Sequence, residues 1–325
     1  MLTRREYLAL TAQAGAALAL GAASGCASTA STAPQAPRTQ AAGVMTRPVP
    51  KTGERLPIVG LGSSATFSQV ARADDIEAIK SVFMAMLEQG GTVFDTAPGY
   101  GASEEAAAKA VNDLNVRDRV FWATKLNVAR RGASADPAQA RQQVEASFSY
   151  LGRDKIDLIQ VHNVADMATQ FPILEEYKQA GRVRYIGTTS TAKQQYATLE
   201  QLMRDEPHDF IGIDYAVDNL SAEERIFPLA QDRGIGVLVY LPFGRDRLWD
   251  RVEGHEVPQW AAEFGATTWA QFFLKFAASH PAVTAVTPAT SKAHHMVDNM
   301  TAARGRLPDQ AERKRMVDFI AALPA

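Results

Sequence analysis

The chain contains very little cysteine and almost no excess charge. Cys26 is the only cysteine among the 325 residues, so no disulfide can form within the chain and the compartment cannot be inferred from cross-links. The formal net charge of -2 gives no electrostatic reason to expect a nucleic acid or an anionic membrane as a partner. The histidines, including the adjacent His294 and His295, lack the spacing with cysteine or carboxylate that is typical of metal sites. We therefore expect neither a metal nor a nucleic acid as a ligand.

A long apolar run is also missing. The weakly apolar stretch near the N-terminus includes Thr11 and Gln13, and it is too short and too polar for a membrane-spanning helix. Arg4 and Arg5 precede it in the motif TRREYL, which is similar to the twin-arginine export signal. We expect residues 1–26 to be an export signal peptide and the protein to be periplasmic. An ordinary secretory signal and a disordered tail are the alternatives.

The motif ASGC, which ends at Cys26, resembles a lipobox, in which a cysteine becomes the lipid-modified N-terminus. Ala23 replaces the leucine that is usual in such a motif. Two interpretations stay open, a lipid anchor at Cys26 or a free cysteine in a discarded peptide, and one lipid chain would anchor only modestly. Residues 27–44 are rich in Ala, Ser, Thr, Pro and Gln, which predicts a flexible tether.

The remaining chain, residues 45–325, alternates short apolar segments with segments of helical periodicity. Near-continuous apolar runs are typical of parallel strands that are buried on both faces. Eight such runs occur, at residues 58–62, 92–95, 120–125, 157–162, 184–190, 210–215, 236–240 and 282–288. Between the first two runs, apolar residues recur every three or four positions over residues 76–87, and Asp136 with Pro137 predicts the start of a later helix.

This alternation predicts a single-domain α/β fold, a (β/α)8 TIM barrel. An open doubly wound sheet is the alternative, but it favours a Gly-x-Gly-x-x-Gly turn, and the segment GLGSSA at residues 60–65 lacks the third glycine. Thr52 and Gly53 lie between two extended runs, which predicts a small hairpin at the bottom of the barrel. We expect a monomer.

Polar residues follow three consecutive predicted strands. Asp95 ends the second strand with Tyr100 five residues later, Lys125 ends the third and His162 ends the fourth. Each residue alone has an ordinary explanation, such as a helix cap, a packed aromatic or a solvated lysine. Together they converge on the barrel mouth, where Lys125 would pair with Asp95 and place a positive charge beside Tyr100. This set suits a general acid and a stabilised alkoxide, but none of these side chains can supply a hydride, so we expect a cofactor.

Several ordered motifs resemble the aldo-keto reductases over residues 45–323. They are FDTAPGYGASE, SFSYLGRDKIDLIQVH, GRVRYIG, YLPFGR and TPATSKAHHMVDN. The resemblance implies an NADP(H)-dependent oxidoreductase that interconverts a small carbonyl and its alcohol. It implies that Tyr100 is the proton donor of a tetrad that also contains Asp95, Lys125 and His162.

The resemblance also implies cofactor contacts along the barrel mouth. Tyr240 matches the position that stacks on the nicotinamide, and Thr189 and Ser190 match a pair that holds its carboxamide. The adenosine end matches the set Thr290, Ser291, Lys292, His295, Asp298 and Asn299.

Four positions depart from the family pattern. Gly212 and Ser190 replace a glutamine and an asparagine that contact the carboxamide, while His295 and Ala289 replace an arginine and a lysine. The loss of the arginine leaves open how strongly NADP(H) is preferred over NAD(H), because a neutral histidine is a poorer phosphate partner. A nucleotide-binding envelope subunit or sensor with weak catalysis is therefore the alternative function.

The substrate is set by loops over the barrel mouth. The sequence offers Phe67, Trp122, Asn163 and residues 243–249 as candidates, with Trp122 and Trp249 as walls of the pocket or as ordinary packing residues. An exported enzyme would need its cofactor loaded in the cytoplasm, and the twin-arginine route, which moves folded proteins, is consistent with this.

Overall fold

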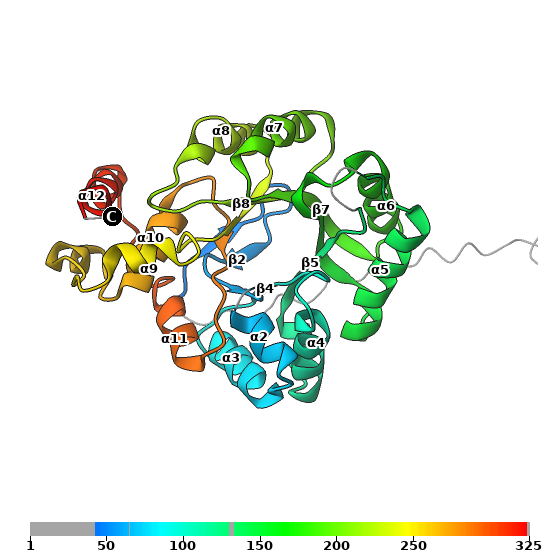
Figure 1. Cartoon of the computed structure of the whole chain (residues 1–325), viewed down its shortest axis with the longest axis horizontal. Coiled ribbons are helices and arrows are strands. Elements are labelled where there is room, and N and C mark those ends of the chain that lie inside the picture. Colours follow the sequence, from blue (N-terminus) through cyan, green and yellow to red (C-terminus); the bar gives the residue numbers. More distant parts are fainter. Residues whose placement is uncertain (1–42, 65, 130–132, 324–325) are drawn as a thin grey trace, which may run out of the picture. The chain divides into compact units, whose positions relative to one another are not determined.

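The computed structural model describes residues 43–64, 66–129 and 133–323. The predicted signal peptide, Cys26 and nearly all of the predicted tether therefore lie outside the described residues. The predicted (β/α)8 barrel is confirmed, because eight parallel strands form one sheet in the order β3 to β10 (Figure 1). The strands are β3 Leu61–Gly62, β4 Val93–Asp95, β5 Phe121–Leu126, β6 Ile156–Val161, β7 Val183–Ser190, β8 Phe210–Asp214, β9 Gly236–Tyr240 and β10 Ala285–Val286.

The barrel closes between its first and last strands through single bridges. Val59 pairs with Val286 and Gly62 pairs with Ala289, both in parallel orientation. The two closing strands are shorter than the sequence predicts, because the rest of each apolar run meets its neighbour only at such bridges.

The predicted hairpin is also confirmed. It consists of β1 Thr46–Pro48 and β2 Arg55–Pro57, which pair antiparallel. Its Val49 and Leu56 pack against Phe121 and Phe210, which begin β5 and β8, so the hairpin closes the amino-terminal end of the barrel.

The helices lie around the strands in Figure 1. They are α2 Thr66–Arg72, α3 Ile76–Glu88, α4 Ser103–Asp113, α5 Pro137–Leu151, α6 Met167–Gln179, α7 Tyr196–Asp205, α8 Ile226–Asp232, α9 Arg247–Val252, α10 Trp269–Ser279, α11 Ala293–Thr301 and α12 Gln310–Ala322. Short 3-10 turns are η1 Arg117–Arg119, η2 His162–Val164, η3 Lys193–Gln195, η4 Ser221–Glu223 and η5 Gln259–Phe264. None of the helices in the described part is long and apolar enough to cross a bilayer.

Two helices begin as their sequences predict. The side chain of Asp136 accepts a hydrogen bond from the amide of Ala138, and Pro137 is the first residue of α5. Asp75 caps α3 in the same way, through the amide of Ala78. Chain direction after α3 reverses at Gly90, whose φ of 87° is a conformation that favours glycine. These local signals set where α5 begins and where α3 begins and ends.

Strand alternation divides the core into two layers. On β5, Phe121, Ala123 and Lys125 point into the barrel, whereas Trp122 points outward and packs on Phe94 under the helices. Trp122 and Phe67 are both almost fully buried in the outer layer. The hypothesis that these two residues form the mouth is therefore wrong. Trp122 lies one step along β5 from side chains that face the interior, which puts it on the other face of the strand. Phe67 lies on α2, and its ring packs on Phe83 and Phe94.

Candidate active site

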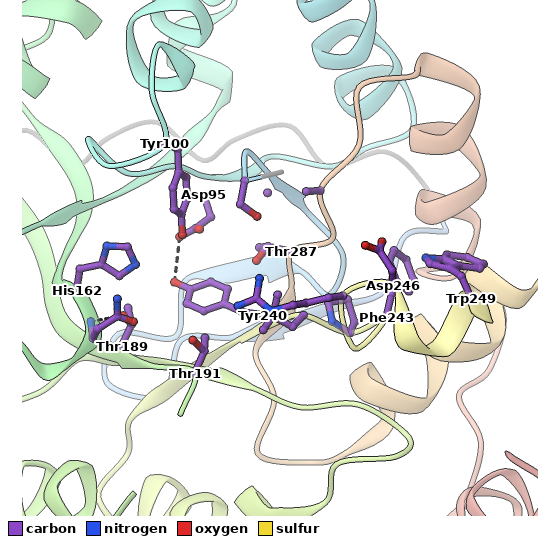
Figure 2. A pocket seen from close by; sticks show the side chains of 17 residues that line it. Asp95, Tyr100, His162, Thr189, Thr191, Tyr240, Phe243, Asp246, Trp249 and Thr287 are labelled. Carbon is purple, nitrogen blue, oxygen red and sulfur yellow. Dashed lines mark hydrogen bonds between the residues drawn. The ribbon is translucent and has the colours of Figure 1, made fainter. Parts of the chain in front are cut away.

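The four predicted catalytic residues meet at the carboxyl ends of the strands. Asp95 ends β4 and Lys125 lies on β5, and the Lys125 Nζ donates hydrogen bonds to Asp95 Oδ2 at 2.7 Å and to the carbonyl oxygen of Thr96 at 2.9 Å. The same Nζ lies 5.2 Å from the ring centroid of Tyr100. Figure 2 shows Tyr100, Asp95 and His162 pointing toward a common space. The barrel therefore places a buried ammonium beside a phenol at the mouth.

In the Lys125–Asp95 pair, each charge favours the ionised form of the other group. Burial by itself lowers the pKa of Lys125, but Asp95 and Tyr100 attract its ammonium and raise that pKa above its usual value overall. Burial raises the pKa of Asp95, while the charge of Lys125 and two donated hydrogen bonds oppose this effect. Lys125 thus stays protonated near neutral pH, and it faces the phenol of Tyr100.

His162 begins the η2 turn after β6 and contacts the edge of Tyr100, with 5.8 Å between the ring centroids. Burial and the nearby charge of Lys125 lower the pKa of His162 to about 3. Its Nδ1 has no hydrogen-bond partner among the described residues. The imidazole is therefore neutral at physiological pH, and it can donate an N–H without adding a positive charge.

The neutral state of His162 predicts acid sensitivity. A histidine with a depressed pKa in the folded state stabilises the fold above the unfolded value of about 6.5, and this contribution is lost as the pH falls toward 3. Between pH 7.5 and pH 5 we expect His162→Gln to lose about 2 kcal/mol less of its unfolding free energy than the wild type does. Urea unfolding at both pH values measures this difference.

His255, an exposed histidine outside the cavity, is the control position. We expect His255→Gln to follow the wild type at both pH values. An equal loss of stability in wild type and His162→Gln would show that His162 does not resist protonation.

Two further residues join this polar network. The hydroxyl of Tyr240, on β9, donates to Asp95 Oδ1 at 3.0 Å and accepts a hydrogen bond from Gln160 Nε2 at 3.1 Å. Gln160 was not predicted from the sequence, although strand alternation could have found it, because it lies on β6 two residues before His162, the residue that follows the strand. The phenol of Tyr240 thus lies inside the barrel, next to the carboxylate.

A cavity of about 580 Å³ opens above these groups. Asn163 and Trp249, which the sequence offers as mouth residues, line it. Thr191, Thr287 and Asp246 line it as well, and Figure 2 shows their side chains around the same space. Asp246 belongs to residues 243–249, which the sequence offers as mouth residues. Thr191 was not predicted, because a short polar loop after a strand has no periodicity that distinguishes a lining residue from a solvated one.

A second cavity of about 520 Å³ lies beside the first. The two cavities share Phe243, Trp249 and Ala289 in their walls, so they form one elongated depression. All six residues predicted for the adenosine end line the second cavity, namely Thr290, Ser291, Lys292, His295, Asp298 and Asn299. The structure thus brings this predicted set together, at a distance from the four catalytic candidates.

Some of the predicted cofactor residues are already engaged within the protein. The carboxylate of Asp298 accepts hydrogen bonds from Thr268 at 2.9 Å and from Gln271 at 2.6 Å, so it links α11 to α10. Thr189 lines the first cavity, and its Oγ1 accepts from the amide of Asn163 at 2.9 Å. Ser190 is buried behind it and bonds to Gln195. Contact of these groups with a cofactor stays a prediction.

Similarity to known proteins agrees with this geometry. The Aldo/keto reductase family model matches residues 58–315. An aldo-keto reductase from Bacillus subtilis is 31% identical over 198 residues, which is 58% of this chain and 59% of that protein. A probable aldo-keto reductase from Glycine max is 31% identical over 185 residues, covering 53% of this chain and 50% of that protein. The chain thus spans about half to three fifths of the length of these curated relatives.

Solved structures share the fold. An aldo-keto reductase from Klebsiella pneumoniae in complex with NADPH has a TM-score of 0.68 and 21% identity over 82% of this chain and 92% of that chain. The holo form of an aldo-keto reductase from Bacillus halodurans has a TM-score of 0.67 and 23% identity over 86% of this chain and 98% of that chain. At such identities the likeness supports the barrel architecture.

Proposed function

Because the chain belongs to the aldo/keto reductase family, we propose that it is an NADP(H)-dependent oxidoreductase that reduces a small aldehyde or ketone to an alcohol, or catalyses the reverse. The observation that carries this proposal is the buried Lys125–Asp95 pair beside Tyr100 at the floor of an open cavity. A buried ion pair is costly unless it is well paired, so a buried pair is weak evidence for a role in stability. General acid catalysis accounts for it.

The elongated depression fits an extended dinucleotide. One end holds Tyr100 and His162, and the other holds Lys292 and His295, with the aromatic side chains of Phe243 and Trp249 between them. Lys292 is an exposed cation that suits the phosphate at the adenosine end, and Thr189 suits the nicotinamide amide. His295 lies in the same cavity, but burial and the charges of His294 and Lys292 lower its pKa, so it would contact the phosphate as a neutral hydrogen-bond donor. The residues present therefore fit NADP(H).

When bound, NADPH supplies the hydride for the carbonyl carbon. The protein's own residues handle the proton. Tyr100 donates its phenolic proton to the carbonyl oxygen, and the ammonium of Lys125 stabilises the phenolate that is left. Asp95 holds the ammonium through its hydrogen bond. In the reverse direction, the phenolate of Tyr100 accepts the proton of the alcohol.

His162 orients the carbonyl group. A neutral imidazole with a pKa of about 3 can donate a hydrogen bond to the substrate oxygen from the wall of the cavity. Together with the hydroxyl of Tyr100, it forms the pair of donors at which the alkoxide charge develops.

The test uses the purified domain and the absorbance of NADPH. We expect oxidation of NADPH that depends on a small aldehyde or on a quinone-like carbonyl, and a smaller rate with NADH. Tight NADP(H) binding without turnover on a broad carbonyl panel would favour the alternative, a nucleotide-binding subunit or sensor of weak activity. The ratio of the rates with NADPH and NADH measures how strongly the enzyme with His295 prefers the cofactor that carries the extra phosphate.

We also propose that the protein is exported to the periplasm through the twin-arginine route and that it acts as a monomer. Arg4, Arg5 and the ASGC motif at Cys26 support the export proposal from the sequence. Mass spectrometry of protein from the envelope fraction would measure the cleavage site, a lipid on Cys26 and any NADP(H) that co-purifies. Recovery of uncleaved protein in the cytoplasm would contradict this proposal, and light scattering would test the monomer.

A further inference from the structure

Tyr240 lies within the polar network of the barrel, although its family position implies a platform for the nicotinamide. Its side chain is 9% exposed, and its ring centroid lies 5.0 Å from the Nζ of Lys125. Figure 2 shows the hydroxyl directed at Asp95, to which it donates at 3.0 Å. The hydroxyl thus contacts the charged pair directly.

Gly212 on β8 provides the space for this arrangement. A Cβ atom at Gly212 would lie 2.2 Å from Cε2 of Tyr240 and 2.6 Å from its Cζ and Oη, so a larger residue there would displace the ring. Leu241, the next residue along the chain, has a φ of 52°, a conformation that is strained for leucine. The small residue Gly212 on β8 and the strained residue Leu241 after β9 together keep the Tyr240 ring inside the barrel.

The carboxylate of Asp95 consequently has one donor for each oxygen. Lys125 bonds to Oδ2 and Tyr240 bonds to Oδ1. Asp95 is 4% exposed, so water cannot readily replace a missing donor. Removal of the Tyr240 hydroxyl would leave Oδ1 without a side-chain donor among the described residues.

We propose, building on the function proposed above, that Tyr240 is a positioning residue of the proton-donating site. Its hydroxyl anchors Asp95, and through Asp95 it holds the ammonium of Lys125 where that group faces Tyr100. Gly212 is the residue that admits the ring to this position. The exposed face of the Tyr240 ring can also stack on the nicotinamide, but stacking would not need the hydroxyl.

The groups around Asp95 set the expected pH response. They are Lys125 from β5, Tyr240 from β9, Tyr100 from the loop after β4 and His162 from η2, and the charge of Lys125 also lowers the pKa of Glu104 of α4, which burial raises. Burial raises the pKa of Asp95, and the Tyr240 hydrogen bond opposes this rise. Loss of that bond should therefore move the acidic limb of the kcat profile upward by about one pH unit.

Tyr240→Phe tests the proposal with NADPH and a reactive aldehyde. We expect kcat to fall about tenfold, because a hydrogen bond to a buried charge is lost. The KM for the aldehyde and the Kd for NADPH, measured by protein fluorescence, should change less than about twofold, because the ring remains in place. The upward shift of the acidic limb distinguishes this role from simple loss of packing.

Tyr196→Phe is the matched control. The Tyr196 hydroxyl also donates to a carboxylate, Asp214 Oδ1 at 2.7 Å, but neither residue lines the cavity. We expect Tyr196→Phe to lose stability and to keep wild-type kcat and pH profile. Gly212→Ala should displace the Tyr240 ring and reproduce the changes in kcat and pH profile that Tyr240→Phe causes. The double variant Gly212→Ala with Tyr240→Phe should have a kcat no lower than that of either single variant.

Wild-type kcat and pH profile in Tyr240→Phe would overturn the inference and leave the proposed function intact. If the wild type itself shows no turnover, the proposed function fails. The role of Tyr240 is then tested by the unfolding free energies of the cofactor-free wild type and Tyr240→Phe at different pH values. The stability loss caused by Tyr240→Phe should then shrink as the pH falls through the raised pKa of Asp95, because the protonated carboxyl group no longer needs the donor. A pH-independent loss would overturn it.

Discussion

Replacement of Tyr100 with phenylalanine is expected to lower kcat for carbonyl reduction by about 10²- to 10⁴-fold, because the substrate oxygen loses its proton donor. The ring of phenylalanine keeps the edge contact with His162 and the position over the Lys125 ammonium. The Kd for NADPH should therefore change little. Steady-state kinetics with a fixed aldehyde and a binding titration measure the two effects separately.

Tyr150 provides the control for this prediction. It lies on α5, is 43% exposed and is absent from the lining of the main cavity. Tyr150→Phe should keep wild-type kcat. An active Tyr100→Phe enzyme would contradict the mechanism, since the only other hydroxyl described beside the Lys125 ammonium, that of Tyr240, already donates its proton to Asp95.

Lys125→Met is expected to remove activity and to destabilise the fold by about 3–5 kcal/mol, because Asp95 would be left as an uncompensated buried carboxylate. The Lys125 and Asp95 side chains are only 1% and 5% exposed, so solvent cannot screen the remaining charge. Urea unfolding at neutral pH measures the loss of stability. Kinetics on the same preparation measure the loss of activity.

The double variant Lys125→Met with Asp95→Asn distinguishes the two effects. Removal of both charges should restore a large part of the stability and none of the activity. Lys178 pairs with Asp209 but is 36% exposed, so Lys178→Met should cost no more than about 1 kcal/mol and serves as a control. Additive losses in the double variant would contradict a coupled buried pair.

Most of the barrel could be predicted from the sequence. Each of the eight apolar runs corresponds to one strand from β3 to β10. The helix α3 begins where its apolar periodicity begins, and α5 begins where Asp136 and Pro137 predict. These features could be found because a doubly buried strand and a capped helix leave a local pattern of residues. The lengths of β3 and β10 could not be predicted from the sequence, because they depend on how the last strand of the barrel pairs with the first.

The candidate site was predicted in part. The order of Asp95, Lys125 and His162 along consecutive strands predicts their convergence, and the structure brings them together beside Tyr100. Trp122 was offered as a pocket wall, but it lies in the outer core, because its place one residue from Ala123 puts it on the other face of β5. A sequence motif cannot show which face of β5 a residue occupies unless the register of the strand in the sheet is known.

The sequence by itself determined the alternation of strands and helices, and it put a carboxylate, a lysine and a histidine at the strand ends that meet at one mouth. Only the tertiary structure decided which atoms bond there. Tyr240 reaches Asp95 across 145 positions of the chain, and it does so because Gly212 leaves a space that a side chain would fill. Such contacts depend on the packing of strands that are distant in the sequence, so no local pattern records them.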